Sequence, residues 1–219
     1  MFIGHYAVAF AAKKAAPKVS LGTLFLAVQF LDLLWPILVL LGLEHFRIDP
    51  GNTAFTPLDF YDYPISHSLL TALVWSIGLA GVYNILRGYP RGSLVVGAGV
   101  FSHWILDYIT HGPDMPISPW METTVGLGLW NSIPATILVE GGLFVVGVVL
   151  YLRSTEAMDR KGKWALWSLI AFFVLVWIAN MAGPPPPNEM AVAYSALLLW
   201  LMVPWGYWID RHRRSATVD

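Results

Sequence analysis

The sequence predicts an all-α protein, a bundle of about six membrane-spanning helices with a half-length helix at the N-terminus. Hydrophobic residues make up 57% of the 219-residue chain and charged residues only 12%, whereas a soluble domain has about 25% charged residues. The apolar residues gather in runs that are long enough to cross a bilayer. The 11 Trp and 9 Tyr residues are typical of proteins with aromatic side chains at both membrane interfaces.

The expected spans follow from these runs. They cover residues 20–43, 64–86, 92–111, 131–152, 163–182 and 191–209. Residues 2–16 form a shorter apolar run, which at about 1.5 Å per residue crosses only part of a bilayer. Pro64 and Pro134 suit the first turn of a helix, whereas Pro36 predicts a kink inside the first span. We treat residues 1–219 as a single integral membrane domain.

The basic residues predict the orientation. Twelve of the thirteen Lys and Arg residues lie on one side of the expected spans, and only Arg47 lies on the other. Because the basic side of a membrane protein faces the cytoplasm, we expect a multi-pass protein of a bacterial-type inner (plasma) membrane with its C-terminus in the cytoplasm. The charges near the N-terminus follow the apolar run instead of preceding it, so we expect this segment to stay in the mature protein and not to act as a signal peptide.

Composition also excludes some functions. The formal net charge of −1 gives no electrostatic support for a nucleic-acid partner. The chain has no cysteine, so disulfides and thiolate ligands are excluded. Any bound metal ion must therefore be held by His, Asp or Glu.

The most informative motif is SHWILDYITHG. It places His103, Asp107 and His111 at steps of four residues, which on a helix puts all three side chains on roughly one face. Ionisable residues inside a membrane span are costly and indicate a functional site. A buried hydrogen-bonded pair of His103 and Asp107 that joins two helices is the alternative reading.

Counting residues from the expected cytoplasmic turns predicts which polar groups share a depth. His5 lies 13 residues before Lys18, and Asp32 lies 14 residues after it. His103 and Glu140 lie at similar distances from their own turns. These four groups should therefore cluster near mid-membrane, with Asp107 about one turn further out and His67 and His111 near the outer surface.

This layer predicts a metal centre in a cavity that opens to the outer face. The candidate ligands of a divalent ion, with Zn²⁺ expected, are His5, Asp32, His67, His103, Asp107 and His111. The candidate catalytic residues are Glu140 and Asp107, either of which can take a proton from metal-bound water, and His67, which can stabilise an oxyanion.

Four segments resemble successive motifs of the YdjM-like inner-membrane proteins, described as membrane-bound metal-dependent hydrolases: IGHYAVAF, AVQFLDLLW, YPISHSLL and GVFSHWILDYITHGPDMPISP. His5 matches the early His of the family, and Asp32 matches the first Asp of its Pro-Asp-x-Asp segment. His67 matches its His-Ser-Leu segment, and His103 with Asp107 matches its His-x-x-x-Asp segment. The resemblance covers about residues 1–119, and the three further spans, within 131–209, carry none that we identify.

The chain departs from the family pattern at two places. Leu34 replaces the second Asp of Pro-Asp-x-Asp, and Asp62 and Tyr63 stand where the family has His-Arg. A one-metal site and a non-catalytic site are therefore both open in place of a two-metal site. The resemblance implies metal-dependent hydrolysis, and the position of the site favours a lipid-like or amphiphilic substrate drawn from the membrane. A proton- or metal-ion-coupled transporter and a non-catalytic membrane scaffold are the alternatives.

Overall fold

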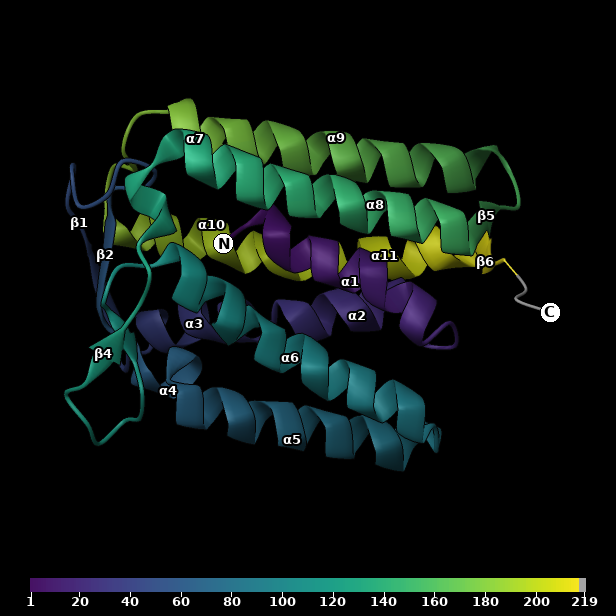
Figure 1. The fold of residues 1–219 in the computed structure, drawn as a ribbon, viewed down its shortest axis with the longest axis horizontal. Helices are drawn as coiled ribbons and strands as arrows, with labels where there is room; N and C mark the ends of the chain where they lie inside the picture. The colour runs from purple at the N-terminus through teal and green to yellow at the C-terminus, as the bar shows by residue number, and fades with distance from the viewer. Residues whose placement is uncertain (217–219) are drawn as a thin grey trace.

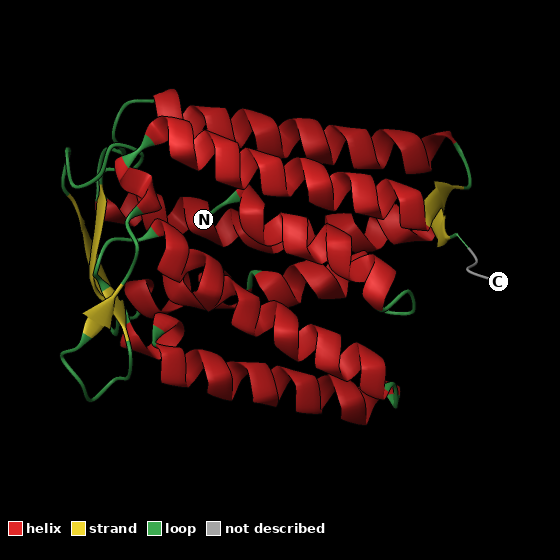
Figure 2. Ribbon diagram, in the orientation of Figure 1, coloured by secondary structure: helices red, strands yellow, loops and turns green. Residues whose placement is uncertain are grey.

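The computed structural model describes residues 1–216. Long helices lie side by side and form a bundle, and short strands occur only at its two ends (Figures 1 and 2). Five helices of the described part are long and apolar enough to cross a membrane, and a sixth span is obtained when one bent pair is counted as a unit. The predicted all-α bundle with about six spans is confirmed.

The bounds of the spans agree closely with the predicted runs. They are α2 (Leu21–Val28) with α3 (Phe30–Leu40), α5 (Leu69–Arg87), α6 (Pro90–Thr110), α7 (Ile133–Thr136) continued by the π-turn η2 (Ile137–Gly141) and α8 (Gly142–Ser154), α9 (Arg160–Ala182), and α10 (Glu189–Leu197) continued by η3 (Leu198–Leu201) and α11 (Met202–Arg211). The outward faces carry exposed apolar side chains, as on α5, where Ile77 and Ile85 are 72% and 84% exposed. Such faces suit contact with lipid.

The half-length helix α1 (Ile3–Ala15) lies inside the bundle (Figure 1). It packs against α8, α2, α6 and α9, and His5, Tyr6 and Phe10 are fully buried. Gly147 allows α8 to pack closely against α1, because a Cβ atom there would lie only 2.4 Å from the carbonyl oxygen of Ala7. Small residues at such contacts are typical of helix packing in membranes.

The first span is bent by 55° between α2 and α3, at Gln29. The kink predicted at Pro36 is therefore misplaced, because Pro36 lies within the continuous helix α3. The break occurs where Gln29 leaves helical geometry, with φ −106° and ψ 6°. As a result Asp32 lies in the first turn of α3.

The second span is also interrupted. The turn α4 (Pro64–His67) ends at Ser68, whose extended backbone separates it from α5. The Ser68 hydroxyl accepts a hydrogen bond from the backbone N–H of Thr71 and so caps α5. Because of this interruption, His67 belongs to the short turn α4 and not to the long helix α5.

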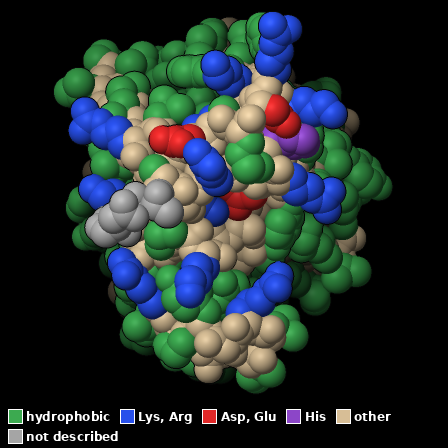
Figure 3. Space-filling model, turned by 90° about the vertical axis from the view of Figure 1, so that its right-hand side faces the viewer, with side chains coloured by type: hydrophobic (Ala, Val, Ile, Leu, Met, Phe, Trp, Pro, Cys, Tyr) green, Lys and Arg blue, Asp and Glu red, His purple; other side chains and the backbone are tan. Residues whose placement is uncertain are grey.

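Short strands and turns mark two chemically different ends of the bundle. The hairpin end carries β1 (His45–Ile48), β2 (Leu58–Asp62), β3 (Met115–Pro116), β4 (Thr124–Val125) and the 3₁₀ turn η1 (Leu129–Asn131). The opposite end, which we call the basic end, carries β5 (Thr155–Ala157) and β6 (Arg213–Ser215). Lys and Arg side chains gather on the face of the basic end (Figure 3). The sequence did not predict these strands, which are only two to five residues long.

The distribution of charge leads to a prediction about orientation. A C-terminal alkaline phosphatase fusion is expected to be inactive, because the excess of Lys and Arg predicts that the basic end faces the cytoplasm. A fusion inserted at Asn52, in the loop between β1 and β2, is expected to be active. The enzyme activity of the two fusions in intact cells is the measurement, and an active C-terminal fusion would reverse the orientation.

Candidate metal centre

Polar side chains from four segments meet inside the bundle, near its hairpin end. His5 comes from α1, Asp32 from α3, His67 from α4, and His103 and Asp107 from α6. They form two groups with ligand atoms close enough to share a metal ion: His5, His103 and Asp107, and Asp32, His67 and His103. The two groups share His103.

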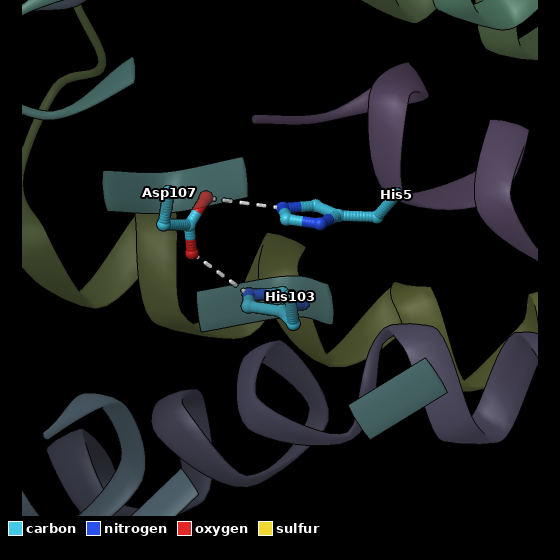
Figure 4. A group of neighbouring side chains, drawn as sticks. All are labelled: His5, His103 and Asp107. Atoms are coloured by element: carbon cyan, nitrogen blue, oxygen red, sulfur yellow. Dashed lines mark hydrogen bonds and ion pairs between the residues drawn. The ribbon is translucent and has the colours of Figure 1, made fainter. Parts of the chain in front are cut away.

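Asp107 is the buried centre of the first group. Its Oδ1 atom lies 3.1 Å from His5 Nε2, and its Oδ2 atom lies 3.0 Å from His103 Nε2 (Figure 4). The imidazole rings of His5 and His103 are stacked, with centroids 3.7 Å apart. The α-amino group of Met1 also contacts Asp107 Oδ1. One carboxylate therefore joins α1 to α6.

Asp32 belongs to the second group and is the most exposed of the five, with 30% of its side chain accessible. Its Oδ1 atom lies 3.4 Å from His67 Nε2 and 3.6 Å from His103 Nε2. Its place in the first turn of α3 suits a carboxylate, because the N-terminus of a helix carries partial positive charge.

The bend in the first span orients His103. Val28 is the last residue of α2, so its carbonyl lies at a helix end where such groups lack a partner in their own helix. His103 Nδ1 lies 2.7 Å from this oxygen. A carbonyl can only accept, so Nδ1 carries the proton. In the neutral ring, Nε2 then presents its lone pair to Asp32 and Asp107.

His67 is oriented by a chain of buried hydrogen bonds. Its Nδ1 atom lies 2.6 Å from the hydroxyl oxygen of Ser66, which donates its own proton to Glu44 Oε2 at 2.6 Å. Because the Ser66 proton is committed to Glu44, the hydroxyl accepts from His67 Nδ1–H. His67 Nε2 is thus free to face the carboxylates, as in His103.

Glu44 is fixed in turn by the backbone. Its Oε1 atom accepts from the N–H groups of Ile65 and Ser66, both at 2.7 Å, in the first turn of α4. Burial raises the pKa of Glu44 against the opposing effect of these hydrogen bonds. The sequence showed Glu44 only as an acidic residue of the hairpin end, and Ser66 carried no signal except its place beside His67.

The donor set fits a divalent ion. Two imidazoles present Nε2 to the space that two carboxylates share, and the chain has no cysteine to supply a thiolate. His103 Nε2 is buried and, although it lies 3.0 Å from Asp107 Oδ2, it makes no contact with hydrogen-bond geometry within the described residues. Histidine ligands of metals usually donate their second ring N–H to a carbonyl or carboxylate, which matches His103 directly and His67 through Ser66.

The cluster forms the polar end of a cavity of about 700 Å³. Asp32, His67 and Asp107 line it, together with loop residues of the hairpin end such as Phe55 and Trp130. Its other wall comes from α9, α10 and η3 and is largely apolar. The cavity therefore has ionisable groups at one end and a largely apolar wall along α9, α10 and η3.

Glu140 lies outside both groups and does not line the cavity. Its Oε1 atom accepts from Gly4 N–H of α1 at 3.1 Å, and its Oε2 atom accepts from Trp177 Nε1 of α9 at 3.0 Å. The π-turn η2 brings this fully buried carboxylate to the start of α1. These contacts indicate an anchor for the helix that carries His5, and the role of Glu140 as a general base stays a prediction.

His111 lies nearer the hairpin end and belongs to neither group of ligands. Its Nδ1 atom lies 3.1 Å from Asp114 Oδ1 and 3.3 Å from the Tyr63 hydroxyl, and its ring packs on Trp130 with centroids 4.3 Å apart. His111 lines the cavity. Its part in metal binding stays a prediction.

Fold and site together define a polytopic membrane protein with a cluster of His and Asp at the end of an internal cavity. The chain belongs to the YdjM inner membrane protein family, whose family model matches residues 64–184. The match includes His67, His103 and Asp107 and extends through α9. The resemblance therefore reaches beyond residues 1–119, to which we expected it to be confined. No curated protein and no solved structure matches the chain.

The contacts of Glu140 predict the effect of Glu140→Gln. The amide keeps the side-chain volume but sets an NH₂ group against one of two buried donors, which costs about 1–3 kcal/mol. We expect a lower thermal midpoint in detergent, with little change for Glu156→Gln, whose exposed carboxylate lies at the basic end. A Glu140→Gln variant that keeps wild-type stability but loses activity would instead support the general base.

The hydrogen bonds of Ser66 predict the tautomer of His67. Ser66→Ala removes the acceptor of the Nδ1 proton, so His67 should populate the other tautomer, whereas Ser66→Thr should retain the original one. Ring ¹⁵N NMR of histidine-labelled protein reports the difference, with His67→Gln assigning the signal. Ser168→Ala is the control, because that hydroxyl bonds only within α9. An unchanged His67 signal in Ser66→Ala would refute the relay.

Proposed function

We propose that this protein is a membrane-embedded, metal-dependent hydrolase that acts on a lipid-like or amphiphilic substrate. The observation that carries the proposal is the pair of imidazoles, His67 and His103, whose Nε2 atoms face the carboxylate of Asp32 at the end of the cavity. Two imidazoles and one carboxylate form a donor set of catalytic zinc sites, which leave a further position to water or substrate.

Zn²⁺ is the proposed ion, held by His67, His103 and Asp32, and it would polarise the bond to be cleaved and acidify a water molecule. The remaining residues have roles set by their contacts. Asp107 holds the rings of His5 and His103. Asp32 is the carboxylate most exposed to the cavity, so water and substrate can reach an ion that it holds.

The aromatic packing between the cluster and the basic end favours an enzyme over a transporter. Beyond His5, towards the basic end, the rings of Tyr6, Phe10, Phe25 and Phe173 are fully buried and packed together, with Tyr6 and Phe173 centroids 4.0 Å apart. The residues that line the cavity come from the hairpin end and the adjoining parts of the helices. A transported ion or proton needs a continuous polar path through this layer, and the Tyr6 hydroxyl is the one polar group that these four rings carry.

The proposal predicts that metal and activity disappear together. Purified wild-type protein should contain about one zinc ion per chain, and His103→Ala should lose both the zinc and the hydrolysis of a chromogenic medium-chain acyl ester. Elemental analysis gives the metal content. The matched control is His45→Ala, because His45 pairs with Asp62 on the exposed hairpin and not in the cluster.

Two results would contradict the proposal. If wild-type protein that is purified without chelators and dialysed against zinc retains no ion, the metal centre is refuted. Equal loss of zinc in His103→Ala and His45→Ala would show that the ion is bound at the surface. Thermal unfolding of each variant separates metal loss from loss of the fold.

A further inference from the structure

The apolar part of the cavity runs between two helices that face lipid. On one side it is lined by Phe172, Val176 and Ala179 of α9, and on the other by residues of α10 and η3 such as Ser195 and Leu198. Phe172 and Leu198 are 39% and 60% exposed, so this wall also reaches the outer surface of the bundle. These exposed side chains indicate an opening between the two helices, in addition to the one towards the hairpin end.

The packing of the helices explains this opening. α10 packs mainly against α3, whereas α9 packs against α11, the helix that follows α10 and η3 along the chain. The link between α9 and α10 contains Pro184, Pro185 and Pro186, which also line the cavity. Because proline holds this link in a stiff extended form, it keeps the two helix ends apart.

The depth of the opening matches one leaflet. Phe172 lies ten residues before the end of α9 at Ala182, and at about 1.5 Å per residue this is roughly 15 Å. The hydrocarbon core of a bilayer is about 30 Å thick, so the opening spans about half of it. An apolar chain from the leaflet at the hairpin end fits this dimension.

The charge of the cavity restricts the head group. Asp32 and Asp107 line it, and neither Lys nor Arg does among the described residues. Met1, whose α-amino group contacts Asp107, also lines it, so the two carboxylates outnumber this cationic group when no metal ion is bound. Aromatic rings of Trp35, Phe60 and Trp130 also line the wall, and such rings attract cations and repel anions.

We propose that the gap between α9 and α10 is a lateral portal for an amphiphile with an apolar chain and a head group that has no net negative charge. The chain lies between Val176 and Leu198, and the head reaches Asp32 and His67. This inference rests on the proposed function for the hydrolysis of the amphiphile. Its binding through the portal does not require a metal ion.

Photo-crosslinking in lipid nanodiscs tests the portal. Four probes carry the same diazirine-labelled dodecyl chain with a glycerol ester, trimethylammonium, carboxylate or phosphate head. Mass spectrometry of the adducts should place the glycerol and trimethylammonium probes on α9 and α10 about tenfold more often than the two anionic probes. Equal labelling by all four probes would overturn the inference about charge.

Two tryptophan variants of α9 test the route of entry. Ala179→Trp fills the gap and should reduce labelling of α10 about tenfold. Leu175→Trp adds the same side chain on α9 at a residue that is 66% exposed and does not line the cavity, and it should leave labelling unchanged. Adducts spread evenly over exposed faces such as that of α5 would overturn the portal.

The same probes separate this inference from the proposed function. His103→Ala should lose metal but keep the adducts on α9 and α10. Wild-type protein that holds zinc but shows no preferred adducts there would refute the portal and leave the metal centre standing. Preferred adducts on protein that never binds zinc would support the portal as an amphiphile-binding site and refute the hydrolase.

Discussion

The break at Gln29 is the constraint on which the rest of the site depends. A continuous helix through residues 21–40 would use the Val28 carbonyl within its own ladder and carry Asp32 along a straight path. The 55° bend instead frees that carbonyl for His103 Nδ1 and places Asp32 in the first turn of α3. One local change in backbone thus sets the tautomer of one histidine and the electrostatic surroundings of one carboxylate. The interruption at Ser68 has a similar effect on His67.

The side chains of the cluster are oriented by hydrogen-bond partners that do not themselves line the cavity. Glu44 and Ser66 orient His67. Glu140 of η2 ties the start of α1 to α9, which keeps His5 beside Asp107. Buried polar groups are costly unless they are paired, so these contacts also stabilise the helix arrangement. The geometry of the cluster and the fold are therefore coupled here, because the same hydrogen bonds that join the helices also orient the His and Asp side chains towards one another.

Hydrophobic runs and charge asymmetry predict the spans well, because lipid imposes a strong and regular pattern on sequence. Counting residues also brings His5, Asp32 and His103 to one level, and the structure places their ligand atoms close together. The same count puts His67 nearer the outer surface, whereas His67 Nε2 lies 3.4 Å from Asp32 Oδ1. Depth does not give direction, however. Glu140 lies at a similar level but turns towards Gly4 and Trp177, and His111 turns towards Asp114. The bend at Gln29 and the contacts of Glu44 depend on residues distant in sequence, so no local sequence pattern predicts them. Pro36 was the stronger local signal for a kink, yet α3 continues through it.

The central claim is that His67 and His103 bind one divalent ion together with a carboxylate. X-ray absorption spectroscopy of zinc-loaded protein tests it most directly, in a His45→Ala/His212→Ala background that removes the two histidines of the surface ion pairs. The account predicts nitrogen and oxygen ligands only, with two imidazoles at about 2.0–2.1 Å, and loss of one imidazole in His67→Ala. An unchanged zinc spectrum in both His67→Ala and His103→Ala would contradict it.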